Sequence, residues 1–361
     1  MKILIGSDIV PTALSEQLFI KQDVQTLFGD VYKHIQEADR TVVNLECALT
    51  TTEGAIKKFG PALKADPKCA DALKKVGVTD VMLSNNHVFD FGVQGLKDTI
   101  ANLERVGLPY SGVGENEMDA RKPYVIEQDG KKIGFINVCE HEYSYALPDR
   151  MGANAFDPFI TMQDIRALKK QTDYVIVLYH GGKELCQYPS PRLRNLSHEM
   201  VLCGADVVVA QHSHCIGCYE EFEGAHIVYG QGNFHFCWQN RAPLWDDALL
   251  IELDITDKVG IKFIPITTTS DRIDVAKGEK GEEILSSFAS RNEELKSGKW
   301  KDGWHAFCES VEASYKKVLK GLEQEDTLEK QTQKFAHYLD CEAHTDVWRE
   351  LFPTWNTTNE K

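Results

Sequence analysis

Polar side chains with metal-binding chemistry stand directly after short apolar runs in this sequence of 361 residues. The runs span residues 3–6, 41–45, 80–83, 174–179 and 206–210. The side chains that close or follow them are, in order, Asp8, then Asn44 and Glu46, then Asn85, Asn86 and His87, then His180, and finally His212 and His214. Imidazole, carboxylate and amide oxygen together suit Mn, Fe, Zn or Ni better than purely soft or purely hard ions. The pattern therefore predicts one or two divalent transition-metal ions as the cofactor.

Two ions fit this donor set better than one, because the donors outnumber the four ligands of a tetrahedral zinc site. Two-metal sites activate water for attack at phosphorus or at a carbonyl carbon. Each group taken alone has a simpler interpretation. Asp8 could cap a helix, and Asn85 and Asn86 could serve a turn. Their joint occurrence after five runs favours the metal site.

The elements that must position these side chains alternate along the first two-thirds of the chain. Apolar runs alternate with amphipathic segments, which is typical of buried and mostly parallel strands connected by helices. Residues 12–39 carry helical spacing. Ligands bind at the carboxyl ends of strands in such sheets. We therefore expect the five groups of polar side chains to meet at one rim.

The later part of the chain has a different pattern. Residues 227–229, 248–255 and 261–266 are strand-like with no helices between them, which suggests a second, antiparallel sheet. After about residue 280 the sequence is rich in Glu, Lys, Leu and Ala. We expect two or three helices there, as a C-terminal appendage.

Composition excludes some classes of protein. Lys and Arg number 40 against 55 Asp and Glu, a net charge of −15, which argues against a nucleic-acid partner. An anionic small molecule is still compatible, because a metal ion would oppose the local charge. No window approaches the roughly 20 apolar residues of a membrane span. The start, MKILIGSDIV, lacks the apolar stretch of about 7–15 residues of a secretory signal. We expect a cytoplasmic protein.

The ten cysteines are too sparse for a disulfide scaffold in a chain of this length. Cys215 and Cys218 form a C-x-x-C pair, which could indicate redox chemistry or zinc binding. A second such pair is missing from the sequence. We favour reduced thiols with no chemistry of their own.

Six strings in the first two-thirds of the chain form a specific combination: SD (7–8), NLE (44–46), SNNHVFDFG (84–92), YHGGKE (179–184), GADVVVAQHSH (204–214) and YGQGNFHF (229–236). Through them, residues 1–240 resemble the CapA family of capsule and poly-γ-glutamate synthesis proteins, which have a calcineurin-like metallophosphatase fold. The resemblance implies a four-layer α/β/β/α sandwich. Together with the change in composition after about residue 280, it predicts a CapA-like domain at 1–280 and a C-terminal helical extension packed on it at 281–361.

The resemblance also implies roles for single residues. Asp8 and His214 match ligands of a first metal, and Glu46 matches the carboxylate that bridges both. Asn86, His180 and His212 match ligands of the second metal, and His87 matches the histidine that donates a proton to the leaving group. One family position departs, because Val10 stands where a further histidine would bind the first metal.

Residues around this set have alternative roles that the sequence leaves open. Asn44 either orients Glu46 or closes a strand. Asn85 and Asp90 are expected to support the loop around His87. Glu184 could bind substrate, hold His180 or face solvent, and Asn233 could reach the site or serve a turn. Lys183, Arg192 and Arg194 could steer an anionic substrate, although a solvated face is the default for such a group.

Two functions follow from these expectations. The first is a metal-dependent hydrolase in capsule or poly-γ-glutamate metabolism, in which metal-activated water attacks a phosphoester or a γ-glutamyl amide. The second is a non-catalytic accessory protein that binds metal and a poly-γ-glutamate-like polymer, or a capsule-assembly partner. A structural protein with a relic site is the least favoured.

Overall fold

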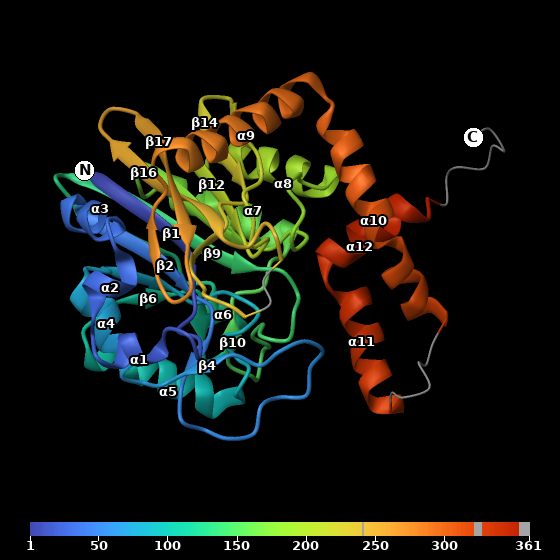
Figure 1. Cartoon of the computed structure of the whole chain (residues 1–361), viewed down its shortest axis with the longest axis horizontal. Coiled ribbons are helices and arrows are strands. Elements are labelled where there is room, and N and C mark those ends of the chain that lie inside the picture. The colour runs from blue at the N-terminus through green and yellow to red at the C-terminus, as the bar shows by residue number, and fades with distance from the viewer. Residues whose placement is uncertain (240–241, 321–326, 354–361) are drawn as a thin grey trace.

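Two β-sheets face each other in the computed structural model, which describes residues 1–239, 242–320 and 327–353 (Figure 1). The first sheet has the order β18 (Ile273–Val275), β17 (Val259–Thr268), β16 (Asp247–Ile255), β1 (Lys2–Ile9), β2 (Arg40–Leu45), β5 (Asp80–Met82) and β6 (Tyr110–Ser111), and β15 (Asn233–His235) also pairs with β1. The second has the order β13 (Tyr219–Phe222), β14 (Ala225–Tyr229), β12 (Val207–Gln211), β11 (Tyr174–His180), β9 (Lys131–Cys139) and β8 (Tyr124–Gln128). Two short pairs, β3 (Ala48–Leu49) with β4 (Lys64–Ala65) and β7 (Val113–Gly114) with β10 (Gly152–Ala153), lie outside these sheets.

The strand sequences explain why the sheets stack. Successive side chains of a strand point to opposite faces, so a continuous apolar run feeds two cores at once. In β1, Ile3 and Ile5 pack between the sheets, whereas Leu4 packs on the outer face. In β11, Ile176 and Leu178 pack between the sheets in the same way. The apolar runs are therefore buried on both faces.

Helices cover both outer faces, which completes four layers. The first sheet is covered by α1 (Glu16–Ile20), α2 (Val24–Phe28), α3 (Val31–Glu37), α4 (Cys69–Val76) and α5 (Gly92–Arg105). The second is covered by α7 (Pro158–Lys169) and α8 (Pro191–Leu202), and the short α6 (Glu117–Ala120) packs near β7 and β10. The predicted α/β/β/α arrangement is confirmed (Figure 1).

Two local expectations differ from the structure. Residues 12–39 form three short helices instead of one long pattern, because the turns at 21–23 and 29–30 interrupt them. The later strands do not form a sheet of their own. β14 adds to the second sheet parallel to β12. In the first sheet, β16 pairs antiparallel with β1, and β17 pairs antiparallel with β16. Apolar pattern alone does not specify which sheet a strand joins.

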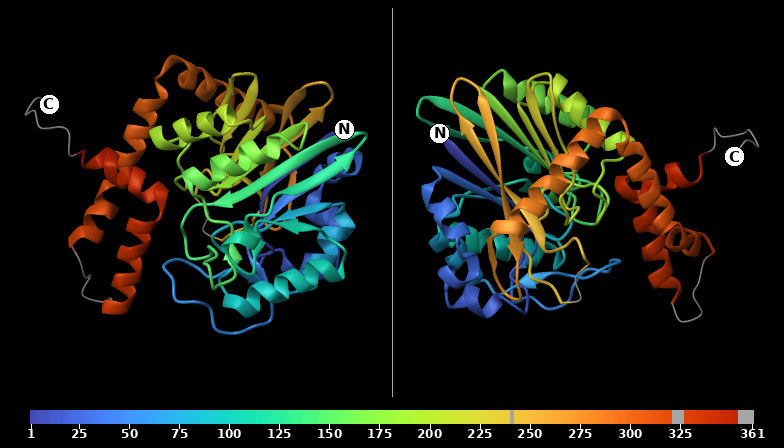
Figure 2. Two further views of the ribbon diagram at one scale, coloured as in Figure 1. Left: turned by 180° about the vertical axis from the view of Figure 1, so that it is seen from behind. Right: turned by 45° about the horizontal axis from the view of Figure 1, so that its top comes forward.

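The helical part that follows the sheets has four helices among the described residues: α9 (Gly278–Ser297), α10 (Trp300–Lys320), α11 (Leu328–Asp340) and α12 (Glu342–Leu351). Ile284 and Phe288 of α9 pack beside β16, and Trp304 and Tyr315 of α10 join the core under the second sheet. Helices α10 to α12 stand together at one side of the sandwich (Figure 2). The predicted C-terminal helical region is confirmed, although the described residues form four helices where two or three were expected. The boundary at residue 280 stays a prediction. Residues 321–326 and 354–361 of the expected extension lie outside the described residues.

Candidate metal centre

The predicted polar side chains meet where the carboxyl ends of the two sheets come together. Asp8 lies near the carboxyl end of β1 and Glu46 follows β2 in the first sheet, whereas His180 ends β11 in the second. His212 and His214 follow β12 of the second sheet. All five side chains are buried. The site is thus built from the edges of two sheets, and not from one rim of a single sheet as we expected.

Glu46, His180 and Asn86 approach at distances that suit ligands of one ion. The Nε2 atom of His180 lies 3.2 Å from Oε1 of Glu46 and 3.0 Å from Oδ1 of Asn86. Metal bonds of about 2.0–2.2 Å place neighbouring ligand atoms about 3 Å apart. The rings of His180 and His212 have centroids 4.9 Å apart, so His212 is a neighbour of the same group.

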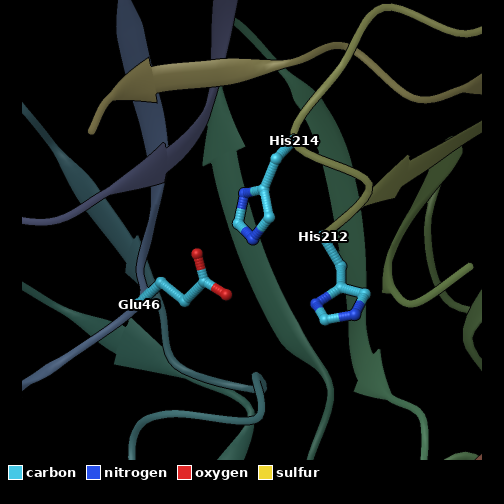
Figure 3. Close-up of side chains that lie close together, drawn as sticks. All are labelled: Glu46, His212 and His214. Carbon is cyan, nitrogen blue, oxygen red and sulfur yellow. The ribbon is translucent and has the colours of Figure 1, made fainter. Parts of the chain in front are cut away.

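Two groups of three donors could each hold a metal ion. One contains Asp8, Glu46 and His180, and the other contains Glu46, His212 and His214, with the donor atoms of each group within 4.8 Å of one another. Figure 3 shows the second group, with both imidazoles and the carboxylate directed toward a common space. Glu46 belongs to both groups, as a bridging carboxylate would. The resemblance instead joins Asp8 with His214 and His180 with His212, and these pairs are also neighbours: Nδ1 of His214 lies 3.6 Å from Oδ2 of Asp8, and the rings of His180 and His212 are adjacent. Which donors share an ion stays a prediction.

The electrostatics of these residues fit a divalent cation. Both carboxylate oxygens of Glu46 and Nδ1 of His212 are buried and have no hydrogen-bond partner among the described residues. Burial, Asp8 and Glu184 hold the pKa of Glu46 well above its usual value. Burial also lowers the pKa of His180 and of His214, with the neighbouring imidazoles adding to the effect. Neutral imidazole is the form that binds metal, and a cation would satisfy the unpartnered atoms.

The turn that carries the two histidines is strained. His212 has φ 84° and His214 has φ 52°, both in the left-handed region. That region costs about 1–3 kcal/mol for a residue other than glycine and persists where the surrounding structure enforces it, often at functional sites. The backbone N–H of His212 donates to Oδ2 of Asp8 at 3.2 Å, which ties the turn to β1.

Amide side chains orient the ligands. Nδ2 of Asn44 donates to Oδ1 of Asp8 at 2.7 Å and lies 3.1 Å from Nδ1 of His180, so this amide nitrogen orients Asp8 and His180 and not Glu46. Oδ1 of Asn233 lies 2.8 Å from Nδ1 of His214, which leaves Nε2 of that imidazole for a metal. Such outer contacts fix the tautomer and ring orientation of metal-binding histidines.

The loop after β5 places His87 beside a buried ion pair. Nδ1 of His87 lies 2.7 Å from Oδ2 of Asp90, and the ammonium of Lys58 lies 3.2 Å from the same nitrogen and 2.5 Å from the other oxygen of Asp90. Asn85 shapes this loop, since its Oδ1 accepts from the backbone N–H groups of His87 and Val88. Burial and the charge of Lys58 lower the pKa of His87. The sequence analysis missed Lys58, which comes from a loop with no local signal.

A cavity of about 250 Å³ opens beside these residues. Asn86, His87 and His212 line one wall, and Lys58 and Lys183 bring positive charge to it. Glu184 also lines the cavity, in contact with solvent. The cavity is large enough for a small anionic substrate or one end of a polymer.

Two of the expected steering residues lie elsewhere. Arg192 pairs with Glu140 and with Asp346 of α12, and Arg194 pairs with Glu220. Neither guanidinium is available for substrate, because each already neutralises buried carboxylates. Within the expected cationic group, only Lys183 lies on the cavity.

Other positions agree with a simple structural role. Val10 is buried in the apolar core and offers no ligand, so the first metal lacks a further donor from position 10. Cys215 and Cys218 are buried thiols that form no disulfide.

Glu142, which follows β9, was not among the predicted ligands. Its Oε2 accepts from Nδ2 of Asn86 at 2.8 Å, and its Oε1 lies 3.8 Å from Nε2 of His212.

Comparison with known proteins gives a consistent family. The model of the bacterial capsule synthesis protein family PGA_cap matches residues 2–237. The capsule biosynthesis protein CapA of Bacillus anthracis is 31% identical over 180 residues, which are 48% of this chain and 44% of that protein. The PGA biosynthesis protein CapA of Bacillus subtilis is 33% identical over 236 residues, 63% of this chain and 61% of that protein. The chain thus spans about half to three-fifths of the length of these curated relatives.

Among solved structures, a putative 5′-nucleotidase from Staphylococcus aureus aligns with a TM-score of 0.46 and 16% identity, covering 80% of this chain and 58% of that one. A likeness of this size carries no conclusion about activity. Among the described residues, no helix is both long enough and apolar enough to cross a membrane.

Proposed function

This chain belongs to the bacterial capsule synthesis protein family PGA_cap, and from that premise we propose that it is a metal-dependent hydrolase of capsule or poly-γ-glutamate metabolism. The observation that carries the proposal is the state of Glu46. It is fully buried, has two unpartnered oxygens and belongs to both groups of potential ligands. A buried carboxylate in this state is costly without a cation to compensate it.

The proposed ligands are Asp8, Glu46, Asn86, His180, His212 and His214, which would hold one or two divalent ions of Mn, Fe, Zn or Ni. When bound, such ions act as Lewis acids and make water nucleophilic near neutral pH. The role of the chain is to hold these donors in place. Asn44 and Asn233 do this through Asp8 and His214.

His87 is the proposed catalytic residue that handles the leaving group. Nδ1–H of His87 donates a hydrogen bond to Oδ2 of Asp90, so Nε2 of the neutral ring carries no proton. The lowered pKa means that the ring is mostly neutral near pH 7. It donates a proton only after it has taken one up, and a bound anion in the cavity would favour this protonated form.

Lys183 and the proposed ions would make the cavity suitable for an anionic substrate, whereas the ammonium of Lys58 is already paired with Asp90. The substrate must carry negative charge and a bond that water can cleave. A phosphoester and a γ-glutamyl amide with free carboxylates both have these two features. The relatives named for capsule and PGA biosynthesis favour the second substrate.

The alternative function is an accessory protein that binds metal and polymer without turnover. Val10 favours it, because position 10 gives the first metal no ligand. The arrangement of His87, Asp90 and Lys58 favours the hydrolase, because metal binding alone does not require a positioned proton carrier.

Metal content and turnover distinguish the two functions. The chain is purified without chelator, and Mn, Fe, Ni and Zn are quantified. Aryl phosphomonoester, aryl phosphodiester and poly-γ-glutamate are then assayed with each metal restored. Bound metal with turnover that is lost in His87→Ala supports the hydrolase. Bound metal with polymer affinity but no turnover on any substrate supports the accessory role.

A further inference from the structure

A second cluster of metal-type donors lies where the C-terminal helices meet the sandwich. Glu142 comes from the loop after β9, Cys341 stands between α11 and α12, and His344 lies in the first turn of α12. One carboxylate oxygen, the thiol sulfur and one imidazole nitrogen of these residues lie within 4.8 Å of one another. All three residues are more than nine-tenths buried.

The potential ligand atoms of this cluster converge. The thiol of Cys341 donates a hydrogen bond to Oε1 of Glu142, with Sγ 3.1 Å from that oxygen. Nδ1 of His344 is already bonded to the hydroxyl of Tyr315 at 2.6 Å, so Nε2 is its available donor. Tetrahedral zinc with bonds of about 2.0 Å to oxygen and 2.3 Å to sulfur separates these two ligand atoms by about 3.5 Å. The observed spacing is therefore close to that of a bound state.

Hydrogen bonds and an ion pair connect the two segments that carry the cluster, the loop after β9 and the start of α12. Oε2 of Glu140 accepts from the backbone N–H of Ala343 at 3.2 Å, and the imidazole of His141 lies 2.6 Å from Glu342. These contacts fix the start of α12 against the loop after β9. A rigid arrangement reduces the cost of bringing distant ligands together.

We propose that Glu142, Cys341 and His344 bind a zinc-type divalent ion at a site separate from the one at Glu46. Thiolate, imidazole and carboxylate together select zinc or cobalt over magnesium, calcium or manganese. Binding releases the thiol proton of Cys341 to solvent, because the metal ligand is the thiolate.

This ion would face the same cavity as the first site. Glu142 and His344 line that cavity together with His87 and His212. Three protein ligands leave one tetrahedral position open, as in zinc sites that bind water or substrate. His337 stands beside the cluster, with its ring centroid 4.6 Å from that of His344 and with Nδ1 unpartnered among the described residues. The open position is thus available to an anionic group of a bound ligand or to this imidazole.

The site is not a property carried over from the family match. The match ends at residue 237, whereas Cys341 and His344 lie about a hundred residues beyond it. A metal–thiolate signal would report on this cluster alone, because the main site contains no cysteine. The signal can be measured whether or not the protein is a hydrolase.

Cobalt substitution tests the proposal directly. The full chain is stripped with chelator and titrated with Co²⁺, and the thiolate-to-cobalt charge-transfer absorption in the near ultraviolet is recorded. We expect this band in the wild type and its loss in Cys341→Ser. His344→Gln should weaken the apparent cobalt affinity by about tenfold or more, as loss of one ligand does.

Two variants serve as controls. Cys308→Ser removes another buried thiol, on α10, and should leave the band unchanged. Glu46→Gln alters the main site and should also leave it unchanged, which separates the two proposals. Far-ultraviolet circular dichroism checks that each variant is folded. A wild type that shows no band at saturating Co²⁺, or a folded Cys341→Ser variant that keeps the band, would overturn the proposal.

Discussion

The substitution Glu46→Gln tests the main metal site through stability, without any assumed substrate. Glutamine keeps the shape of the side chain and removes its charge. The pKa of Glu46 is raised by burial and by the charges of Asp8 and Glu184. A carboxyl whose pKa rises on folding stabilises the protein below its unfolded pKa, and this contribution is lost as the pH rises through the folded value. In chelator, the variant should match the wild type at acid pH and exceed its stability as the pH rises.

Added metal should reverse this order. A ligand at about 100 times its Kd adds about 2.7 kcal/mol to the free energy of unfolding. An unfolding entropy of about 2.1 cal/mol/K per residue gives about 0.76 kcal/mol/K for the 361 residues. The unfolding midpoint of the wild type should therefore rise by about 3–4 °C, and that of Glu46→Gln by less than about 1 °C.

The assay is differential scanning calorimetry with Mn²⁺, since manganese prefers oxygen and nitrogen ligands and avoids the thiolate of Cys341. Glu53→Gln is the matched control, because Glu53 is an exposed glutamate that pairs with Lys64 and with none of the proposed ligands. The reasoning fails if Mn²⁺ raises the midpoint equally in the wild type and in Glu46→Gln. It also fails if the metal-free variant is less stable than the wild type at every pH.

Three further predictions concern proton transfer and the C-terminal contact. His87→Gln should lower kcat on a cleaved substrate by about 10²–10⁴-fold, with metal content by elemental analysis unchanged. Lys58→Met removes a charge that lowers the pKa of His87, so the pH profile of activity should move to higher pH. The same variant leaves Asp90 without its buried partner, which should lower the free energy of unfolding in urea by about 3–5 kcal/mol. Burial raises the pKa of Asp346 to about 6 from 3.8, against the effect of Arg192. About 3 kcal/mol of the free energy of unfolding should therefore be lost as the pH rises from about 4 to 6. Asp346→Asn should remove this pH dependence, whereas the control Asp340→Asn, at an exposed position, should keep it.

The sequence could predict those parts of the site whose signal is local. Asp8, Glu46 and His180 are each recognisable because they end or follow an apolar run, and parallel strands bring such ends together. Lys58 carries no such mark, since it lies in an irregular loop. Glu142 does follow the apolar strand β9, but it lies in the loop beyond it, three positions after the last residue of that strand, so the signal is weaker. Their positions depend on how those loops close over the sheets.

The contribution of the C-terminal helices could not be inferred for a similar reason. Cys341 and Glu142 are 199 residues apart in the chain, and no periodicity in either segment relates one to the other. The same limit explains the wrong sheet assignment of the later strands. A strand pattern specifies burial on two faces, whereas the choice of neighbour depends on tertiary packing.

Charge in the cavity links metal binding to substrate binding. Besides Glu46, whose pKa is raised, the carboxylates of Asp8, Glu142 and Glu184 lie at or near the cavity, and the ammonium of Lys58 is already paired with Asp90. Without cations this surface repels an anionic substrate, because unscreened like charges in a partly buried site interact strongly. Each divalent ion offsets two of these charges. Metal should therefore bind before the substrate, and substrate affinity should depend on metal occupancy even in variants that cannot turn over.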